Sequence, residues 1–185
     1  MLFLEISATV LGLLQGFFVM LNKRSNWIFY ILQMICLICF SLGNKLFGDV
    51  INNSVYLVMG ILGFILWNKK TENKITTCPI KEKICYTAVI CISTLILGSI
   101  LSQTADPRPF TDAFTTTSSF TATYYMVRRK IDTWIIWFIN DIFYAIQYFL
   151  LPHPAYYLMM LNIIWTTMAV ASYVNWLRIM KGTAK

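Results

Sequence analysis

Seven long apolar stretches, separated by short polar breaks, run along the 185-residue chain. They cover residues of about 2–21, 27–43, 49–67, 84–102, 110–127, 134–151 and 155–177. Each has close to the roughly 20 residues that an α-helix needs to cross a bilayer. The first stretch lacks the basic start of a secretory signal peptide, so we expect it to be a membrane helix as well. The pattern predicts an all-α integral membrane protein with seven transmembrane helices.

The composition agrees, because 58% of the residues are hydrophobic and only 12% are charged, whereas a soluble domain usually carries about 25% charged residues. Of the 15 lysines and arginines, all except Lys45 and Arg108 fall on one side of the seven predicted helices. The positive-inside rule then places the C-terminus in the cytoplasm and the N-terminus outside. Membrane orientation therefore explains the net charge of +7, and no nucleic-acid partner is expected.

The chain contains an internal repeat. The second predicted helix begins with SNWIFYILQM and the sixth with IDTWIIWFIND, and three pairs of positions match: Trp27 with Trp134, Tyr30 with Trp137, and Met34 with Asp141. Each motif follows a basic turn and precedes a helix that ends in Trp before a basic run. At an offset of about 107–109 residues, the first three and the last three helices form two parallel repeats joined by a linker helix.

This plan predicts three regions. They are an N-terminal three-helix bundle (1–67), a cytoplasmic loop with the linker helix at about 84–102 (68–109), and a C-terminal three-helix bundle with a short basic tail (110–185). Transporters built from repeats usually bind their substrate between the repeats, near the middle of the membrane.

The fifth stretch is unusual, because eight hydroxyl side chains lie between Thr111 and Thr123. Such residues can allow tight helix packing, or they can line a polar cavity. Thr115, Thr116 and Ser119 are the candidates for lining a substrate path. Asp112 lies at the start of this stretch, where the free N–H groups of a helix favour a carboxylate. Capping is the simpler explanation for Asp112, and a substrate or ion role is the alternative.

Asp141 lies about two turns inside the sixth stretch, too deep for capping. An acid there costs about 2.5–3.5 kcal/mol on insertion scales, so it should face a cavity or a partner. One helical face carries Trp134, Trp137, Asp141, Tyr144 and Tyr148. Its aromatic rings and single negative charge suit a planar, cationic ring. The alternative, an aromatic belt at the membrane interface, explains Trp134 alone but not Trp137 together with Asp141.

Amide side chains inside the predicted helices can bind a substrate or bridge two helices. The candidates are Gln33, Asn140 and Asn162, followed by Asn52 with its neighbour one turn on, Tyr56. The CxxC of Cys36 and Cys39 lies within an apolar stretch, so we interpret both as packing residues. His153 has no second histidine with which to share a metal, and the chain has no ATP-binding or hydrolase motif. No metal, cofactor or catalytic residue is predicted.

Residues 110–180 resemble the PnuC family of vitamin transporters, whose members take up nicotinamide riboside. The match covers DAFTTTSSFTATYYMVRRKIDTWIIWFIND and extends more weakly through YYLMMLNIIWTTMAVASYVNW. The specific element is the family's WxxWxxxN pattern, which is carried here by Trp134 and Trp137. The family's Asn falls on Asp141, with Asn140 one place earlier. The resemblance implies three plus one plus three helices, similar to the SWEET sugar transporters.

The resemblance also implies facilitated diffusion of nicotinamide riboside by alternating access across a bacterial inner membrane. Phosphorylation by a cytoplasmic kinase would make uptake one-way, and a homotrimer is implied. The resemblance leaves thiamine, riboflavin or another (deoxy)nucleoside as alternative cargo, because relatives in the family carry such compounds. Asp141 also departs from the pattern at the expected substrate position. Two alternatives belong to other functional classes. One is a membrane enzyme that uses Asp112 and Asp141, and the other is a receptor or assembly subunit without transport. We expect a transporter and not an enzyme.

Overall fold

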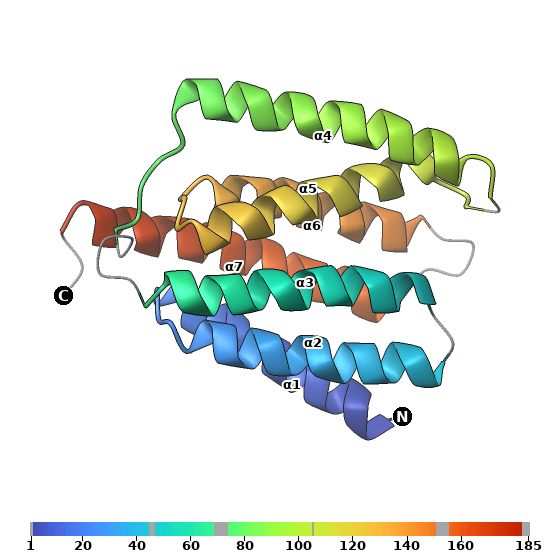
Figure 1. The fold of residues 1–185 in the computed structure, drawn as a ribbon, viewed down its shortest axis with the longest axis horizontal. Coiled ribbons are helices and arrows are strands. Elements are labelled where there is room, and N and C mark those ends of the chain that lie inside the picture. The colour runs from blue at the N-terminus through green and yellow to red at the C-terminus, as the bar shows by residue number, and fades with distance from the viewer. Residues whose placement is uncertain (1, 45–46, 69–73, 105, 151–155, 183–185) are drawn as a thin grey trace. The chain divides into compact units, whose positions relative to one another are not determined.

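The computed structural model describes residues 2–44, 47–68, 74–104, 106–150 and 156–182. Within these residues the chain forms seven α-helices and no strands (Figure 1). The helices are α1 (Leu2–Met20), α2 (Asn26–Gly43), α3 (Phe47–Leu66), α4 (Ile80–Leu101), α5 (Pro109–Val127), α6 (Thr133–Phe149) and α7 (Tyr156–Met180). Each coincides with one predicted stretch, which confirms the all-α, seven-helix prediction. Lys45 and His153 lie outside the described residues.

The helices present apolar surfaces on the outside. By length and composition, α2, α3 and α4 are each apolar enough to cross a membrane, and α1 contains a shorter apolar helix, Ile6–Met20. All seven helices expose large apolar side chains, such as Ile51 at 68% and Leu95 at 61%. Water disfavours so large an apolar surface, whereas a lipid-facing surface requires one. Hydroxyl side chains are concentrated in α5, which is the least apolar of the seven helices.

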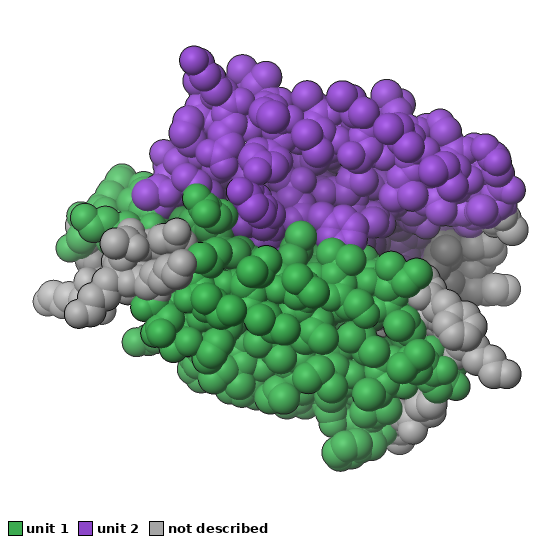
Figure 2. Space-filling view, viewed as in Figure 1, with its two compact units in different colours: residues 1–75, 126–129, 175–185 green, residues 76–125, 130–174 purple. Residues whose placement is uncertain are grey.

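The chain divides into two compact units, shown in different colours in Figure 2. Unit 1 comprises residues 1–75, 126–129 and 175–185, so it holds α1–α3 and the last turns of α5 and α7. Unit 2 comprises residues 76–125 and 130–174, so it holds α4, α6 and most of α5 and α7. The three regions predicted from the sequence, 1–67, 68–109 and 110–185, stay a prediction.

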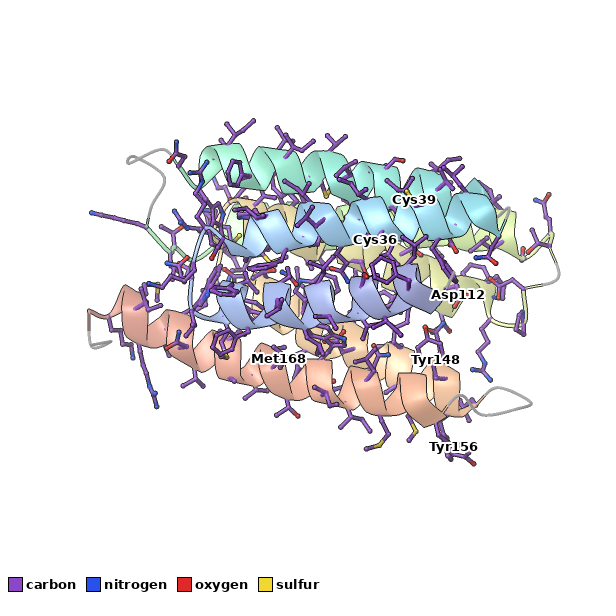
Figure 3. All side chains as sticks on the ribbon, turned by 90° about the horizontal axis from the view of Figure 1, so that it is seen from below. Cys36, Cys39, Asp112, Tyr148, Tyr156 and Met168 are labelled. Atoms are coloured by element: carbon purple, nitrogen blue, oxygen red, sulfur yellow. The ribbon has the colours of Figure 1, made fainter. Side chains whose placement is uncertain are left out.

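All five cysteines carry free thiols. Cys36 and Cys39 lie one turn apart on α2 (Figure 3), where Cys36 is half-buried and Cys39 is exposed. Cys85 and Cys91 are exposed on α4, and Cys78 is buried in the segment that precedes it. The CxxC of α2 therefore forms no disulfide.

The α1–α2 turn and the α5–α6 turn have the same backbone conformation. Asn22 and Arg129 occupy equivalent positions, and both are left-handed, with φ of 53° and 51°. The next residue in each turn donates its N–H to the carbonyl five residues earlier, at 2.9 Å and 2.8 Å. Few non-glycine residues adopt a left-handed conformation, so its recurrence supports a true repeat. The same offset relates Trp27 to Trp134, as the sequence predicts.

Within unit 1, two tryptophans each donate a hydrogen bond to the end of a helix in the opposite repeat. The Trp67 indole, just after α3, donates to the carbonyl of Val127 in α5 at 3.0 Å, and Trp176 of α7 donates to that of Val19 in α1 at 2.9 Å. The Val127 carbonyl lies at the end of α5, where carbonyls have no intrahelical partner, and the Val19 carbonyl also accepts the N–H of Asn22 at 2.9 Å. The guanidinium of Arg129 lies 4.1 Å from the Trp67 ring centroid. Burial lowers the pKa of Arg129 to about 10, so the group stays charged at neutral pH.

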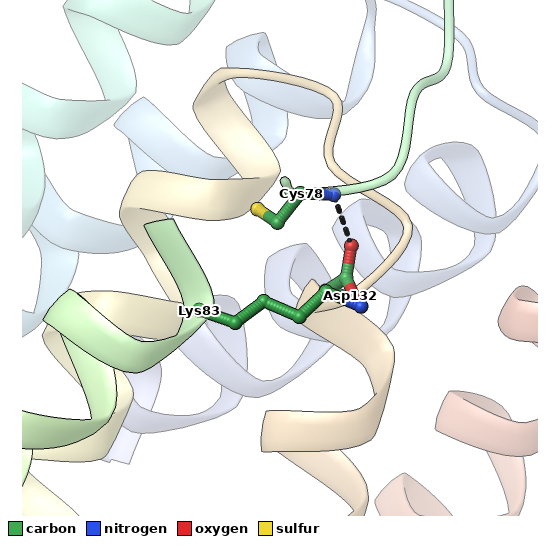
Figure 4. Close-up of polar contacts among 3 residues, drawn as sticks. All are labelled: Cys78, Lys83 and Asp132. Atoms are coloured by element: carbon green, nitrogen blue, oxygen red, sulfur yellow. Dashed lines mark hydrogen bonds and ion pairs between the residues drawn. The ribbon is translucent and has the colours of Figure 1, made fainter. Parts of the chain in front are cut away.

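Within unit 2, Asp132 connects the segment before α4 to the start of α6 (Figure 4). Its carboxylate accepts the backbone N–H of Cys78 at 2.7 Å and forms an ion pair with Lys83 at 2.6 Å. The N–H of Ile131 also donates to the Thr76 carbonyl at 3.0 Å. Burial raises the pKa of the Cys78 thiol. The linker helix α4 is thus attached to the α5–α6 turn by backbone and side-chain bonds.

Candidate functional site

Helix α6 has an inward and an outward face, and Asp141 lies at its midpoint. Asp141 is the ninth of 17 residues, which places it about 12 Å from either helix end. Asp141 and Trp134 are each 6% exposed, and Trp137, Tyr144 and Tyr148 are half-buried. The opposite face is exposed over Ile135, Phe138, Ile139, Phe143 and Ile146. The predicted aromatic and acidic face therefore points inward, and Trp134 is not part of an exposed belt.

One stripe of the inward face bonds α6 to α5. Its members are spaced by seven residues and are Thr133, Asn140 and Gln147. The Thr133 hydroxyl donates to the carbonyl of Ala122 at 2.7 Å. Asn140 is fully buried, donates from Nδ2 to Ser119 Oγ at 2.6 Å and accepts from Ser118 Oγ at 3.0 Å. The Asn140 amide is thus occupied by contacts that hold the two helices together.

The third member of the stripe, Gln147, donates from its amide to the Asp112 carboxylate in the first turn of α5. The guanidinium of Arg108 donates to the carbonyl of Gln147 at 2.8 Å and also to that of Leu150. Asp112 thus joins α5 to α6 in addition to lying at a helix start. Sequence reasoning missed Gln147 and Arg108. The one available signal was the seven-residue spacing from Asn140 to Gln147.

A neighbouring stripe on the inward face of α6 contains Trp137, Asp141 and Tyr148. In the part of the chain that the structure describes, Trp137, Asp141 and Tyr148 form no side-chain hydrogen bond or ion pair. Tyr144 differs, because its hydroxyl is hydrogen-bonded with Thr115 and Ser119 of α5. The Tyr144 and Tyr148 rings stack with centroids 6.2 Å apart. Figure 3 shows Tyr148 toward the same end of unit 2 as Asp112.

The hydroxyl groups of α5 are largely used within the fold. Thr115 and Ser119 are 1% and 3% exposed, and each donates to the carbonyl four residues earlier in its own helix, at 3.1 Å and 2.6 Å. Thr116 is half-buried, and its hydroxyl forms no hydrogen bond with any described residue. These contacts favour tight helix packing as one role of the hydroxyl-rich helix. That it also lines a substrate path stays a prediction.

The other candidates are distributed over both units. Asn162 lies half-buried on α7 in unit 2. Gln33 of unit 1 lies against α1, where a Cβ on Gly12 would meet the Gln33 amide. Asn52 and Tyr56 are half-buried, one turn apart on α3. Their contact with a substrate stays a prediction.

The first repeat has no acid at the position equivalent to Asp141. Trp27, the counterpart of Trp134, is fully buried and packs so closely on α3 that a Cβ on Gly63 would clash with the indole ring. Met34, which is 5% exposed, occupies the position that corresponds to Asp141. At this pair of equivalent positions, only the second repeat carries an acid.

Hydrogen bonding sets the register of the two acids. Asp112 lies level with Gln147, and Asp141 follows Asn140, which lies level with Ser118. The six residues from Asp112 to Ser118 correspond to about 9 Å along the helix axis. Two carboxyl groups that share a proton must be in contact. At this spacing the two carboxyl groups do not share a proton.

Comparisons with known proteins agree with the seven-helix fold. A family model described as "Nicotinamide mononucleotide transporter" matches residues 2–178. The nicotinamide riboside transporter PnuC of Neisseria mucosa is 24% identical over an alignment of length 188, which covers 94% of this chain and 72% of that protein. The crystal structure of the vitamin B3 transporter PnuC is similar with a TM-score of 0.74 and 22% identity, over 98% of this chain and 83% of that one. The last comparison shows a shared fold.

The relatives are named as transporters and not as enzymes. Transporters of this kind are multi-pass membrane proteins, in agreement with the seven helices and their apolar outer surfaces. Because the family model covers nearly the entire chain, the protein belongs to the nicotinamide mononucleotide transporter family, that of the PnuC transporters.

Proposed function

We propose that this protein transports nicotinamide riboside and that the inward face of α6 binds it. The observation that carries the proposal is the stripe of Trp137, Asp141 and Tyr148, which lies inward yet forms no hydrogen bond with the described part of the fold. An inward polar group without a partner is costly in a membrane helix, so a ligand that pairs with it accounts for its presence. The relative from Neisseria mucosa, named as a nicotinamide riboside transporter, supports this cargo.

In this proposal Trp137 stacks on the ring of the cargo, Trp134 supports it from the same face, and Asp141 contacts its polar or charged groups. Further polar contacts and the lining of the path come from the remaining candidates, which are Asn140, Tyr144, Asn162, Gln33, Thr115, Thr116, Ser119, Asn52 and Tyr56. The bonds of Asn140 and Tyr144 to α5 suggest that these two act mainly by holding the helix that carries the stripe.

The mode of transport is facilitated diffusion by alternating access, as in other transporters built from repeats. The absence of an ATP-binding motif from the sequence supports a passive carrier. Uptake becomes one-way when a cytoplasmic kinase phosphorylates the cargo. The asymmetry of basic residues supports an N-terminus outside and a C-terminus in the cytoplasm of a bacterial inner membrane. A homotrimer is the proposed assembly.

The proposal is tested by uptake of labelled nicotinamide riboside into liposomes that contain the purified protein. Trp137→Ala should reduce uptake and weaken binding by about tenfold, because one stacked or cation–π contact contributes up to about 2 kcal/mol. Phe138→Ala is the matched control, since Phe138 is the next residue on α6 and is 37% exposed on the outward face. Equal effects of the two substitutions would remove the support for a site on this face.

The same experiment separates the alternatives. Thiamine is the main rival cargo, because Asp141 replaces the family's Asn at this position and suits a cation. Riboflavin and deoxynucleosides complete the panel, and efficient uptake of one of them in place of nicotinamide riboside would identify a different cargo. Chemically altered cargo would indicate the enzyme alternative, and saturable binding without uptake would indicate a receptor.

A further inference from the structure

The position of Asp141 distinguishes it from every other charged residue in the helices. In α1 to α7 the remaining acids and bases lie within four residues of a helix end, whereas Asp141 is eight residues from each end of α6. Terminal charges reach water or headgroups, but a charge at the midpoint of a membrane helix cannot do so without a partner or a cavity. In its ionised form this acid therefore requires a specific counterpart, and without one it holds a proton.

Within the described residues the fold supplies no such counterpart. The Asp141 side chain is 6% exposed, accepts no hydrogen bond and is close to no cationic side chain. Asp112 differs in this respect, because it is bonded to Gln147 and lies within electrostatic reach of Arg108. Of the two acids on α5 and α6, only Asp141 has no described side chain that would offset a negative charge.

The groups around Asp141 add negative potential and aromatic surface. Tyr144 lies within electrostatic reach of both Asp112 and Asp141, and its ring stacks with that of Tyr148. Trp137 is one turn before Asp141 on the same face. Ring faces carry partial negative charge, so aromatic rings beside a carboxylate form a site that attracts organic cations.

From this arrangement we infer that Asp141 is the charge-selectivity residue of the transporter, and that the site prefers cargo with a positively charged planar ring over neutral cargo of the same shape. The inference rests on the proposed binding face of α6 and narrows its substrate class. Nicotinamide riboside carries a permanent pyridinium charge, and thiamine carries a thiazolium charge. Riboflavin and deoxynucleosides are uncharged in their rings at neutral pH, so the site should discriminate against them.

The test compares two ligands that differ in charge but hardly in shape, nicotinamide riboside and its neutral 1,4-dihydro form. Binding to the full-length protein in nanodiscs is measured for the wild type, Asp141→Asn and Asp141→Glu. The wild type should bind the cation at least about tenfold more tightly, as expected for loss of an interaction with a buried charge. Asp141→Asn should abolish most of this preference by weakening cation binding, and Asp141→Glu should retain a preference.

The outcomes separate the inference from the proposed function. If the wild type binds both forms equally, or if Asp141→Asn changes both affinities by the same factor, charge selection is overturned while the cargo assignment stands. If the wild type binds neither form, the cargo assignment fails, and thiamine is then compared with riboflavin and deoxynucleosides. Preference for thiamine supports charge selection, and preference for a neutral compound or no binding at all overturns it. The wild-type comparison remains decisive even if Asp141→Asn fails to fold.

Discussion

Substitution of Asn140 tests whether this residue binds substrate or holds two helices together. The sequence pattern places it beside Asp141 as a substrate ligand, whereas the structure shows its amide bonded to two serines of α5. The Ser118 hydroxyl has a single proton and also a nearer acceptor, the Phe114 carbonyl at 2.6 Å, so the bond from Asn140 to Ser119 is the stronger of the two. Asn140→Ala removes both bonds.

The expected cost follows from these contacts. Hydrogen bonds between membrane helices average about 0.6 kcal/mol each, with a maximum near 1.7 kcal/mol. A cavity of roughly 30 Å³ adds about 0.7 kcal/mol at 24 cal/mol per Å³. Ser119 keeps its own bond to the Thr115 carbonyl at 2.6 Å, so no buried donor is left unpaired. Asn140→Ala should therefore destabilise the protein by about 2 kcal/mol and lower its unfolding temperature by roughly 4–8 °C.

Thermal unfolding in detergent, together with the affinity for nicotinamide riboside, measures both possible roles. We expect a lower unfolding temperature and an affinity within about threefold of the wild type, and a smaller destabilisation when Ser119→Ala is already present. Ile139→Ala is the control, because that side chain is 41% exposed on the outward face of the same helix. An unchanged unfolding temperature with tenfold weaker binding would refute the structural role and return Asn140 to the substrate site.

Three further predictions concern other contacts. Asp132→Ala releases the segment before α4, so a membrane-impermeant maleimide should modify Cys78 at least about tenfold faster by mass spectrometry, because burial in the wild type raises the pKa of this thiol and keeps the reactive thiolate scarce. An unchanged rate would show that the Asp132 contacts do not hold the segment. Gly63→Ala directs a methyl group into the Trp27 ring and should cost about 1–3 kcal/mol in chemical denaturation, and a neutral effect would contradict the close packing of α2 on α3. Trp176→Phe removes the indole N–H that closes the end of α1 and should lower the stability by about 1 kcal/mol, whereas stability equal to the wild type would show that this bond contributes nothing.

The sequence by itself determined the number and type of the elements and the inward face of α6. Helix length in a membrane is set by the thickness of the bilayer, so hydropathy predicted about 27–43 and 134–151 where the structure has Asn26–Gly43 and Thr133–Phe149. The period of 3.6 residues per turn likewise placed Trp137 and Asp141 on one face from their spacing alone. The matching tryptophans indicated the repeat from the sequence. The structure agrees, because the α1–α2 and α5–α6 turns have the same local conformation.

Only the tertiary structure decided how adjacent polar residues are used. Asn140 and Asp141 are neighbours in the chain and point about 100° apart, and the rotation of α6 against α5 determines which of them meets Ser118 and Ser119. The bond between Gln147 and Asp112 spans 35 residues, so no local pattern could indicate it. Such pairings depend on the relative placement of two helices, which the period of a single helix does not encode. The structure therefore separates polar groups that hold the fold together from those that remain for a ligand.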